Sequence, residues 1–216
     1  GEAVNPFPFL FFEDNPLKHL TRAQNFYKQN FHRNSSRMPH FKNKKIHIGY
    51  FSADFMDHAT MYLISPLFKL HDKSEFEIYL YSFPPKEDKF TEIAKNSGCF
   101  FRDVRELSTI ETVQLARKDN LDIAIDLKGY SKYCRMNIFA HRVASIQINY
   151  LGYPGSLGAK TIDYIIADNI IIPDKYEKFY SEKVIKMPSC YQCNDDKKEI
   201  SIKSISRNKF NIPEKA

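Results

Sequence analysis

The chain has 216 residues, and 32 Lys and Arg against 26 Asp and Glu leave a formal net charge of +6. This length allows one large domain or two small ones, and 43% hydrophobic with 14% aromatic residues excludes a disordered chain. No stretch approaches the roughly 18 apolar residues of a membrane helix, and the first residues lack the basic segment and cleavage site of a signal peptide. We therefore expect a globular protein with no membrane partner.

The positive charge raises the question of a nucleic-acid partner. The densest basic runs are short and lie beside expected elements: Lys42, Lys44, Lys45 and Lys197, Lys198. Such runs are more typical of solvated lysines than of a phosphate-binding surface, so we expect no nucleic acid.

In chain order, the first expected element is a helix over 15–32, because Asn15-Pro16 is a typical helix start and apolar residues then recur at helical spacing. A polar linker over 34–45 follows, and strand and helix patterns alternate from there. Strands are expected at 46–51, 76–83, 99–103, 121–127, 145–151, 164–167 and 184–187. Helices are expected at 60–70, 89–96, 109–118 and 136–141, with Pro66 bending or ending the first of them.

This alternation predicts an α/β fold with a Rossmann-like, doubly wound and mainly parallel sheet. Ligands of such sheets bind outside the carboxyl ends of the strands. The loops that follow the strands are therefore the candidate site.

The loop after the first expected strand contains no glycine between Ser52 and Thr60. A dinucleotide-binding GxGxxG turn would fall here, so its absence argues against a dinucleotide-dependent oxidoreductase. The loop offers Asp54, Asp57 and His58 beside a helix start. His58 is a candidate general base, since imidazole titrates near working pH. The alternative is that Asp54 or Asp57 caps the helix and His58 is merely exposed.

Two later loops carry further candidates. The segment 126–131 ends a strand with a carboxylate and a lysine and then turns at Gly129, which indicates either charged groups at a cleft or a plain turn with Lys128 in solvent. The segment 152–158 holds three of the seven glycines, and its exposed amides are suited to an oxyanion or a sugar hydroxyl. Asp168 ends another strand, where a single carboxylate is more often structural.

The cysteines are Cys99, Cys134, Cys190 and Cys193, and the last two form a CxxC. A zinc site needs further ligands at set spacing, and no second pair is present. Scattered thiols are typical of a reducing compartment, so a cytoplasmic location is expected.

Four stretches together resemble the catalytic region of the O-linked N-acetylglucosamine transferase and SPINDLY family. They are GYFSADFMDHAT (49–60), DLKGYSKYCR (126–135), IQINYLGYPGSLGAKTIDYIIAD (146–168) and EKVIKMPSCYQCND (182–195). The second and third are long and specific. DLKGY and the CYQ-ND run are closer to the bacterial SPINDLY-like branch than to the animal transferases.

The resemblance implies one half of a two-lobed GT-B glycosyltransferase, whose nucleotide-sugar lies mainly on the second lobe. Residues 1–44 would then be a helical lead-in and linker from upstream tetratricopeptide repeats. Residues 45–204 would be the N-terminal Rossmann-like lobe, and 205–216 the truncated start of the second lobe.

The resemblance also implies individual site residues, at the positions of this sequence that match the family's motifs. His58 matches the family's proposed active-site His, although many members follow it with Pro where this chain has Ala59. Asp122 stands where animal members carry a His, so a role inferred from that His does not transfer. Two motifs match the family's substrate-binding loops: Lys128, Gly129, Tyr130, Ser131 and Gly152, Tyr153, Pro154, Gly155.

The implied reaction moves a GlcNAc-like or fucose-like sugar from a UDP- or GDP-linked donor to a Ser or Thr hydroxyl of a protein or peptide, with inversion. His58, or a water-linked carboxylate such as Asp54, would accept the hydroxyl proton. The resemblance implies neither a metal nor another cofactor, and the lobe by itself is expected to be inactive. The alternative is a non-enzymatic α/β binding or regulatory domain, such as a receiver-like module.

Overall fold

The computed structural model describes residues 2–31, 43–202 and 206–213. Within them a single sheet of seven strands has the order β3-β2-β1-β4-β5-β6-β7, and every pair is parallel. This confirms the predicted α/β class. The strands are β1 Ile46–Ser52, β2 Phe76–Ser82, β3 Phe100–Asp103, β4 Ile123–Asp126, β5 Ile146–Asn149, β6 Tyr164–Ala167 and β7 Lys183–Lys186.

Strand β1 is the centre of the topology because it pairs with both β2 and β4. The chain builds outward from β1 to β3, then returns to the other side of β1 and builds outward again to β7. The strand order therefore reverses between β1 and β4, where Phe51 is in register with Asp126. Open parallel sheets bind ligands beyond the carboxyl ends of the strands at such a reversal.

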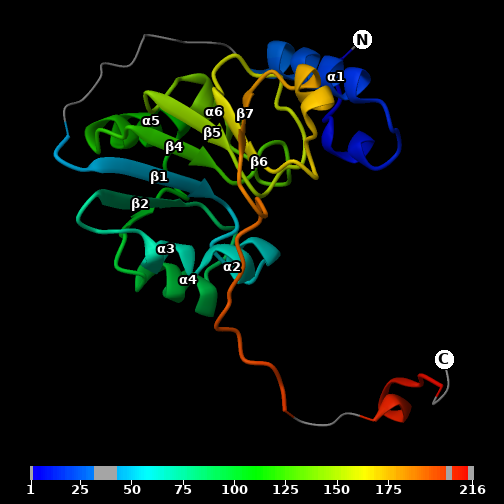
Figure 1. Ribbon diagram of the computed structural model, residues 1–216. Helices are drawn as coiled ribbons and strands as arrows, with labels where there is room; N and C mark the ends of the chain where they lie inside the picture. Colours follow the sequence, from blue (N-terminus) through cyan, green and yellow to red (C-terminus); the bar gives the residue numbers. More distant parts are fainter. Residues whose placement is uncertain (1, 32–42, 203–205, 214–216) are drawn as a thin grey trace.

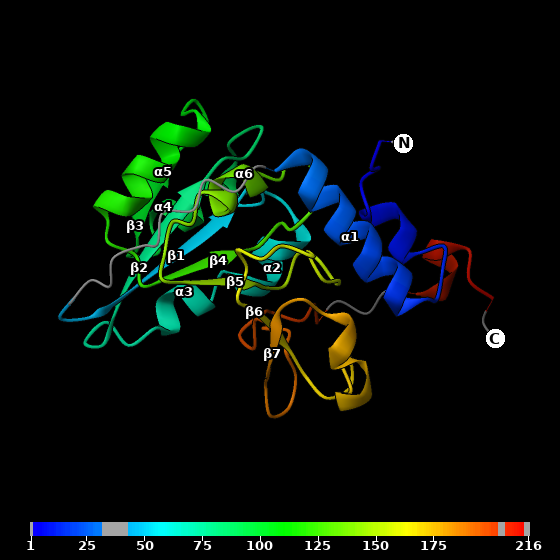
Figure 2. The same cartoon turned by 90° about the horizontal axis from the view of Figure 1, so that it is seen from above.

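Helices cover both faces of the sheet (Figures 1 and 2). One face carries α1 Pro16–Asn30, α5 Thr109–Lys118 and α6 Met136–Ala140, and the other carries α2 Ala59–Ile64, α3 Leu67–Leu70 and α4 Lys89–Lys95. Each layer has its own apolar core against the sheet. Burial on both faces explains why β1 and β2 read as nearly continuous apolar runs.

The N-terminal helix α1 packs into the same core as α5 and α6. Asn15 caps it by accepting from the Lys18 amide at 3.0 Å, as the Asn-Pro start predicted. Ala23 and Tyr27 are buried, and the Tyr27 hydroxyl lies 2.9 Å from Thr161 Oγ1. Three short 3-10 helices complete the described elements: η1 Phe7–Leu10, η2 Asp174–Phe179 and η3 Arg207–Phe210.

The predicted elements differ from the observed ones mainly at their ends, with one helix divided in two. The helix expected over 60–70 divides into α2 and α3, because Pro66 ends the first and precedes the second. The strands expected over 121–127 and 145–151 are shorter, at Ile123–Asp126 and Ile146–Asn149. Most of the predicted linker over 34–45 lies outside the described residues, as do residue 32 and parts of the segment 205–216.

No helix within the described ranges is long and apolar enough to cross a bilayer.

Candidate active site at the carboxyl ends of the strands

The loops after β1 and β4 are joined by a buried ion pair. Lys128 Nζ donates to both carboxylate oxygens of Asp54, at 2.7 and 2.6 Å. The two side chains are only 5% and 6% exposed. A charge removed from water is costly unless it is paired and hydrogen-bonded, so each of these residues depends on the other. The sequence alternative that leaves Lys128 in solvent is wrong.

Asp126, the last residue of β4, shapes the turn that carries Lys128. Its Oδ1 accepts from the Lys128 amide at 2.9 Å, and its Oδ2 accepts from the Gly129 amide at 3.0 Å. Burial raises the pKa of Asp126 to about 7, and the two amides and the nearby ammonium oppose that shift. Gly129 has a φ of +53°, a conformation that glycine adopts without strain.

His58 lies at the edge of this cluster and is its most exposed member. Its side chain is 43% exposed, and Nδ1 lies 3.5 Å from Asp54 Oδ2. The ring caps α2, because Nδ1 accepts from the Thr60 amide at 3.2 Å. The predicted alternative of an aspartate cap is therefore wrong for this helix.

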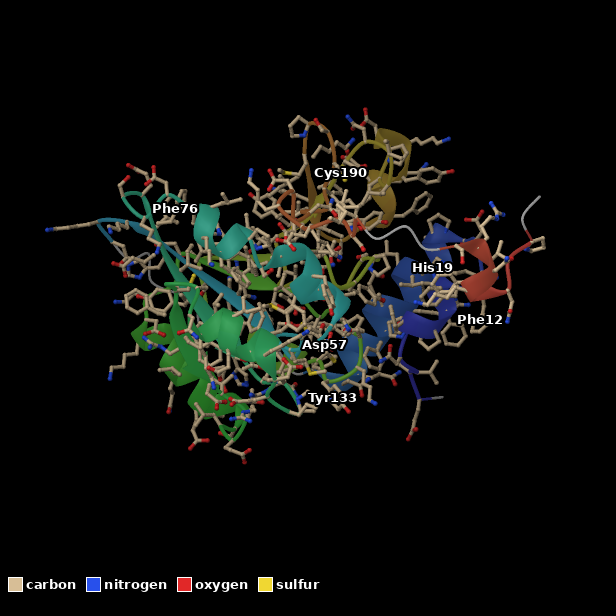
Figure 3. All side chains as sticks on the ribbon, turned by 90° about the horizontal axis from the view of Figure 1, so that it is seen from below. Phe12, His19, Asp57, Phe76, Tyr133 and Cys190 are labelled. Atoms are coloured by element: carbon tan, nitrogen blue, oxygen red, sulfur yellow. The ribbon has the colours of Figure 1, made fainter. Side chains whose placement is uncertain are left out.

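Asp57 faces outward from the same loop. Its carboxylate accepts from the Tyr62 hydroxyl at 2.9 Å. Figure 3 labels Asp57 and Tyr133, one from each of the two loops that the ion pair joins. Both residues are exposed, whereas the two residues of the ion pair are buried.

The tyrosines of the two predicted substrate-binding motifs are buried. Tyr130 is fully buried and donates to the Leu157 carbonyl at 2.5 Å, and Tyr153 is 3% exposed. Their ring centroids lie 5.5 Å apart. These side chains therefore hold the loops after β4 and β5 against each other.

The remaining motif residues lie around that contact. A Cβ at Gly152 would lie 1.8 Å from the Leu127 carbonyl oxygen, so only glycine allows this approach. Pro154 is exposed and Gly155 is buried. Ser131 Oγ is shielded from solvent and makes no hydrogen bond within the described part of the chain.

A buried carboxylate that sequence reasoning missed holds the glycine-rich loop. Glu182 Oε2 accepts from Ser156 Oγ and its Oε1 accepts from the Leu157 amide, both at 2.6 Å. Burial raises the pKa of Glu182, and these hydrogen bonds oppose that rise. Glu182 begins one of the stretches that resemble the family, which was the only sequence signal for a role. A Glu between Ser181 and Lys183 is otherwise typical of an exposed position.

Residues between positions 10 and 20 form one wall of a cavity of about 500 Å³ beside this loop. Its lining includes Phe11, His19, Pro154, Gly155 and Tyr180. Asn5 Nδ2 donates to the Tyr130 carbonyl at 3.0 Å, which ties the start of the described chain to the signature loop. The sequence pattern gave no indication of this contact.

Asp168 and Asp122 have structural partners. Asp168 accepts from the Ile170, Ile171 and Tyr191 amides at 2.9 to 3.0 Å, and these hydrogen bonds lower its pKa. It thereby fastens the segment after β7 to the end of β6. Asp122 Oδ2 accepts from the His47 amide at 2.9 Å, near the amino end of β1.

All four cysteines are free thiols. Cys193 lies beside Tyr150, whose hydroxyl accepts from the Cys193 amide at 3.3 Å, while Cys190 is exposed. Among residues 2–31, 43–202 and 206–213, no group of three His, Cys, Asp or Glu side chains is arranged to hold a metal ion.

Known proteins resemble this chain in both sequence and fold. A probable UDP-N-acetylglucosamine–peptide N-acetylglucosaminyltransferase SEC of Arabidopsis thaliana is 34% identical over 157 residues, which cover 72% of this chain and 16% of that protein. The probable transferase SPINDLY of the same plant is 28% identical, covering 69% and 17%. The UDP-N-acetylglucosamine–peptide N-acetylglucosaminyltransferase of Caenorhabditis elegans is 32% identical, covering 70% and 13%. This chain thus spans less than a fifth of these relatives.

The fold is also that of a solved structure, an O-GlcNAc transferase mutant from Thermobaculum terrenum. The two agree with a TM-score of 0.79 at 24% identity, over 86% of this chain and 37% of that one. The model of glycosyl transferase family 41 matches residues 18–211, which include both the sheet and the joined loops at its carboxyl edge. The chain therefore belongs to glycosyl transferase family 41.

Proposed function

We propose that this chain supplies the first lobe of a protein O-glycosyltransferase. The reaction moves a sugar from a nucleotide-sugar to a Ser or Thr hydroxyl of a protein or peptide, with inversion at the anomeric carbon. The observation that carries the proposal is the Asp54–Lys128 ion pair, which joins two family-like loops at the strand-order reversal and leaves His58 exposed above it. The relatives' names support the reaction class and a peptide acceptor.

In this proposal the lobe forms the acceptor side of a cleft. The loop at 152–158, fixed by Glu182 and Tyr130, forms one wall, and His58 forms the other. A second lobe holds the nucleotide and the charge that develops on the leaving diphosphate, as the two-lobed family architecture implies. We place the lead-in at 1–44, the lobe at 45–204 and the start of the second lobe at 205–216.

The donor is a UDP- or GDP-linked sugar, GlcNAc-like or fucose-like, and transfer proceeds without a metal. Proton transfer from the acceptor hydroxyl and the ordering of two substrates are the steps to which this lobe contributes. Upstream tetratricopeptide repeats would contact the protein acceptor.

A donor screen tests the proposal. The 216-residue chain and the polypeptide of the complete reading frame are each incubated with UDP-GlcNAc and GDP-fucose and a mixture of Ser/Thr peptides, with and without EDTA. We expect transfer by the two-lobed protein only, unaffected by EDTA, and weak donor binding by the chain alone. Micromolar donor affinity of the isolated chain in calorimetry, or no transfer by the complete polypeptide with any donor, would contradict the proposal.

A further inference from the structure

The hydrogen bonds around His58 determine which ring nitrogen carries the proton. The Thr60 backbone amide is directed at Nδ1 at 3.2 Å, and an amide N–H only donates. The Thr60 hydroxyl lies 3.1 Å from Nδ1 and donates to Asp54 Oδ2 at 3.5 Å, so the backbone amide alone fixes the role of Nδ1. Nδ1 is therefore an acceptor, and a neutral imidazole with an accepting Nδ1 carries its proton on Nε2.

Asp54 does not reverse this assignment. In a catalytic His-Asp pair the carboxylate accepts from Nδ1–H, which leaves Nε2 as the basic nitrogen. Here Asp54 Oδ2 lies 3.5 Å from Nδ1, beyond the usual length of a charge-assisted hydrogen bond. Both oxygens of Asp54 already accept from Lys128 at 2.6 and 2.7 Å. The lysine thus neutralises the carboxylate, which weakens its attraction for a proton at Nδ1 of His58.

The other nitrogen belongs to the exposed part of the ring. The side chain is 43% exposed, and no hydrogen bond joins Nε2 to another residue of the described segments. A ligand at the carboxyl edge of the sheet therefore meets an N–H group at this position.

We infer that neutral His58 acts as a hydrogen-bond donor through Nε2–H to an oxygen atom of the nucleotide-sugar, and not as the general base of the reaction. The inference rests on the proposed function for the identity of the ligand. The assignment of the proton rests on the contacts of this chain alone. Proton transfer from the acceptor hydroxyl is then the task of another group.

Nuclear magnetic resonance tests the proton assignment without any transfer reaction. The chain is labelled with ¹⁵N-histidine, and two- and three-bond couplings from the ring protons identify the protonated nitrogen at a pH that keeps the ring neutral. The sequence has seven histidines, so a His58→Asn variant identifies the resonances. We expect the Nε2–H form.

A second variant distinguishes the effect of the Thr60 hydroxyl from that of the Thr60 backbone amide. Thr60→Val removes the hydroxyl and keeps the backbone amide that contacts Nδ1. The Nε2–H form is expected to persist in it. An Nδ1–H form in either protein overturns the inference, whether or not the complete polypeptide transfers sugar.

Two variants of the complete polypeptide then test the role in transfer. Asn at position 58 keeps an oxygen that can cap α2 but has no distal N–H, whereas Gln keeps an N–H near the place of Nε2. If His58 is a hydrogen-bond donor, the His58→Gln variant should retain a kcat/KM about tenfold higher than that of the His58→Asn variant, because one hydrogen bond is worth about that factor. If His58 is the general base, kcat/KM should fall equally in both variants, by about 10²–10⁴-fold. An equal loss overturns the inference.

The ligand oxygen is identified in the same proteins. A loss of affinity in His58→Asn for the free nucleoside diphosphate assigns the N–H to a phosphate oxygen. A loss for the nucleotide-sugar alone assigns it to the sugar. Unchanged affinity for both, together with unchanged kcat/KM, contradicts a donor role.

Discussion

Two regions at the same edge of the sheet are held together by different physics. The loops after β1 and β4 are joined by opposite charges, with Lys128 and Asp54 buried against each other. The loop after β5 is held by close backbone approach at Gly152, by the Tyr130 hydroxyl and by Glu182. The first region depends on the attraction between two opposite charges. The second depends on close packing of the backbone and on hydrogen bonds from uncharged donors.

The comparison implies different responses to substitution. Removal of one charge leaves its partner buried and unpaired, a cost that local relaxation cannot remove. A change in the second region displaces a loop that several independent contacts still hold. The four predictions below run from the largest expected effect to the smallest.

Lys128→Met should cause the largest loss of stability, about 3–5 kcal/mol, because Asp54 is left as a buried and unpaired carboxylate. Urea unfolding of the chain measures it. The double variant Lys128→Met with Asp54→Leu removes both charges and should recover most of the loss. A single-variant loss below about 1 kcal/mol would show that Asp54 does not depend on this lysine.

Gly152→Ala should cost about 1–3 kcal/mol, since its Cβ would lie 1.8 Å from the Leu127 carbonyl oxygen and the backbone must move. Gly155→Ala is the matched control. The nearest atoms to its Cβ, at 3.2 to 3.4 Å, belong to the Tyr153 and Leu10 side chains and not to the backbone. Equal losses in the two variants would contradict close backbone approach as the constraint on this loop.

The raised pKa of Asp126 should make stability fall as pH rises from about 4 to about 7. Its pKa is about 7 in the folded chain against 3.8 as the ordinary value, so the folded state binds more protons across that window. The slope from this group is at most about 1.4 kcal/mol per pH unit. Unfolding of the wild type and of Asp126→Asn at several pH values measures the difference in slope. Parallel curves would remove Asp126 as the source.

His58→Ala should cost about 1 kcal/mol, because the Thr60 amide loses the side chain that caps α2. His58→Asn should restore most of this stability, since Asn is a favourable capping residue. Thermal unfolding of the two variants compares them. If the Ala variant is as stable as the Asn variant, the cap contributes nothing to this helix.

Much of the fold was predictable because its signals are local. Asn15-Pro16 starts α1, Pro66 divides α2 from α3, and the apolar runs mark each strand. The candidate loops were predictable for the same reason, since a parallel sheet puts every strand end at one edge. The family assignment follows from long stretches such as 146–168, which the family model includes.

The partners within the site were not predictable in this way. Lys128 and Asp54 are 74 residues apart, and Glu182 is 26 residues from Ser156. The sequence pattern predicts that Lys128 follows a strand, but it does not predict whether the ammonium group faces water or a carboxylate. The same limit applied to Tyr130 and Tyr153, which look like ligand-binding side chains in the motifs and are buried in the structure.

The sequence by itself determined the order of strands and helices, the parallel class of the sheet and the loops at its carboxyl edge, because periodicity, capping and glycine positions act over a few residues. Only the tertiary structure decided that Lys128 neutralises Asp54 and that Glu182 holds the glycine-rich loop. These are contacts across the fold, and burial and charge pairing exist only once distant segments have been brought together.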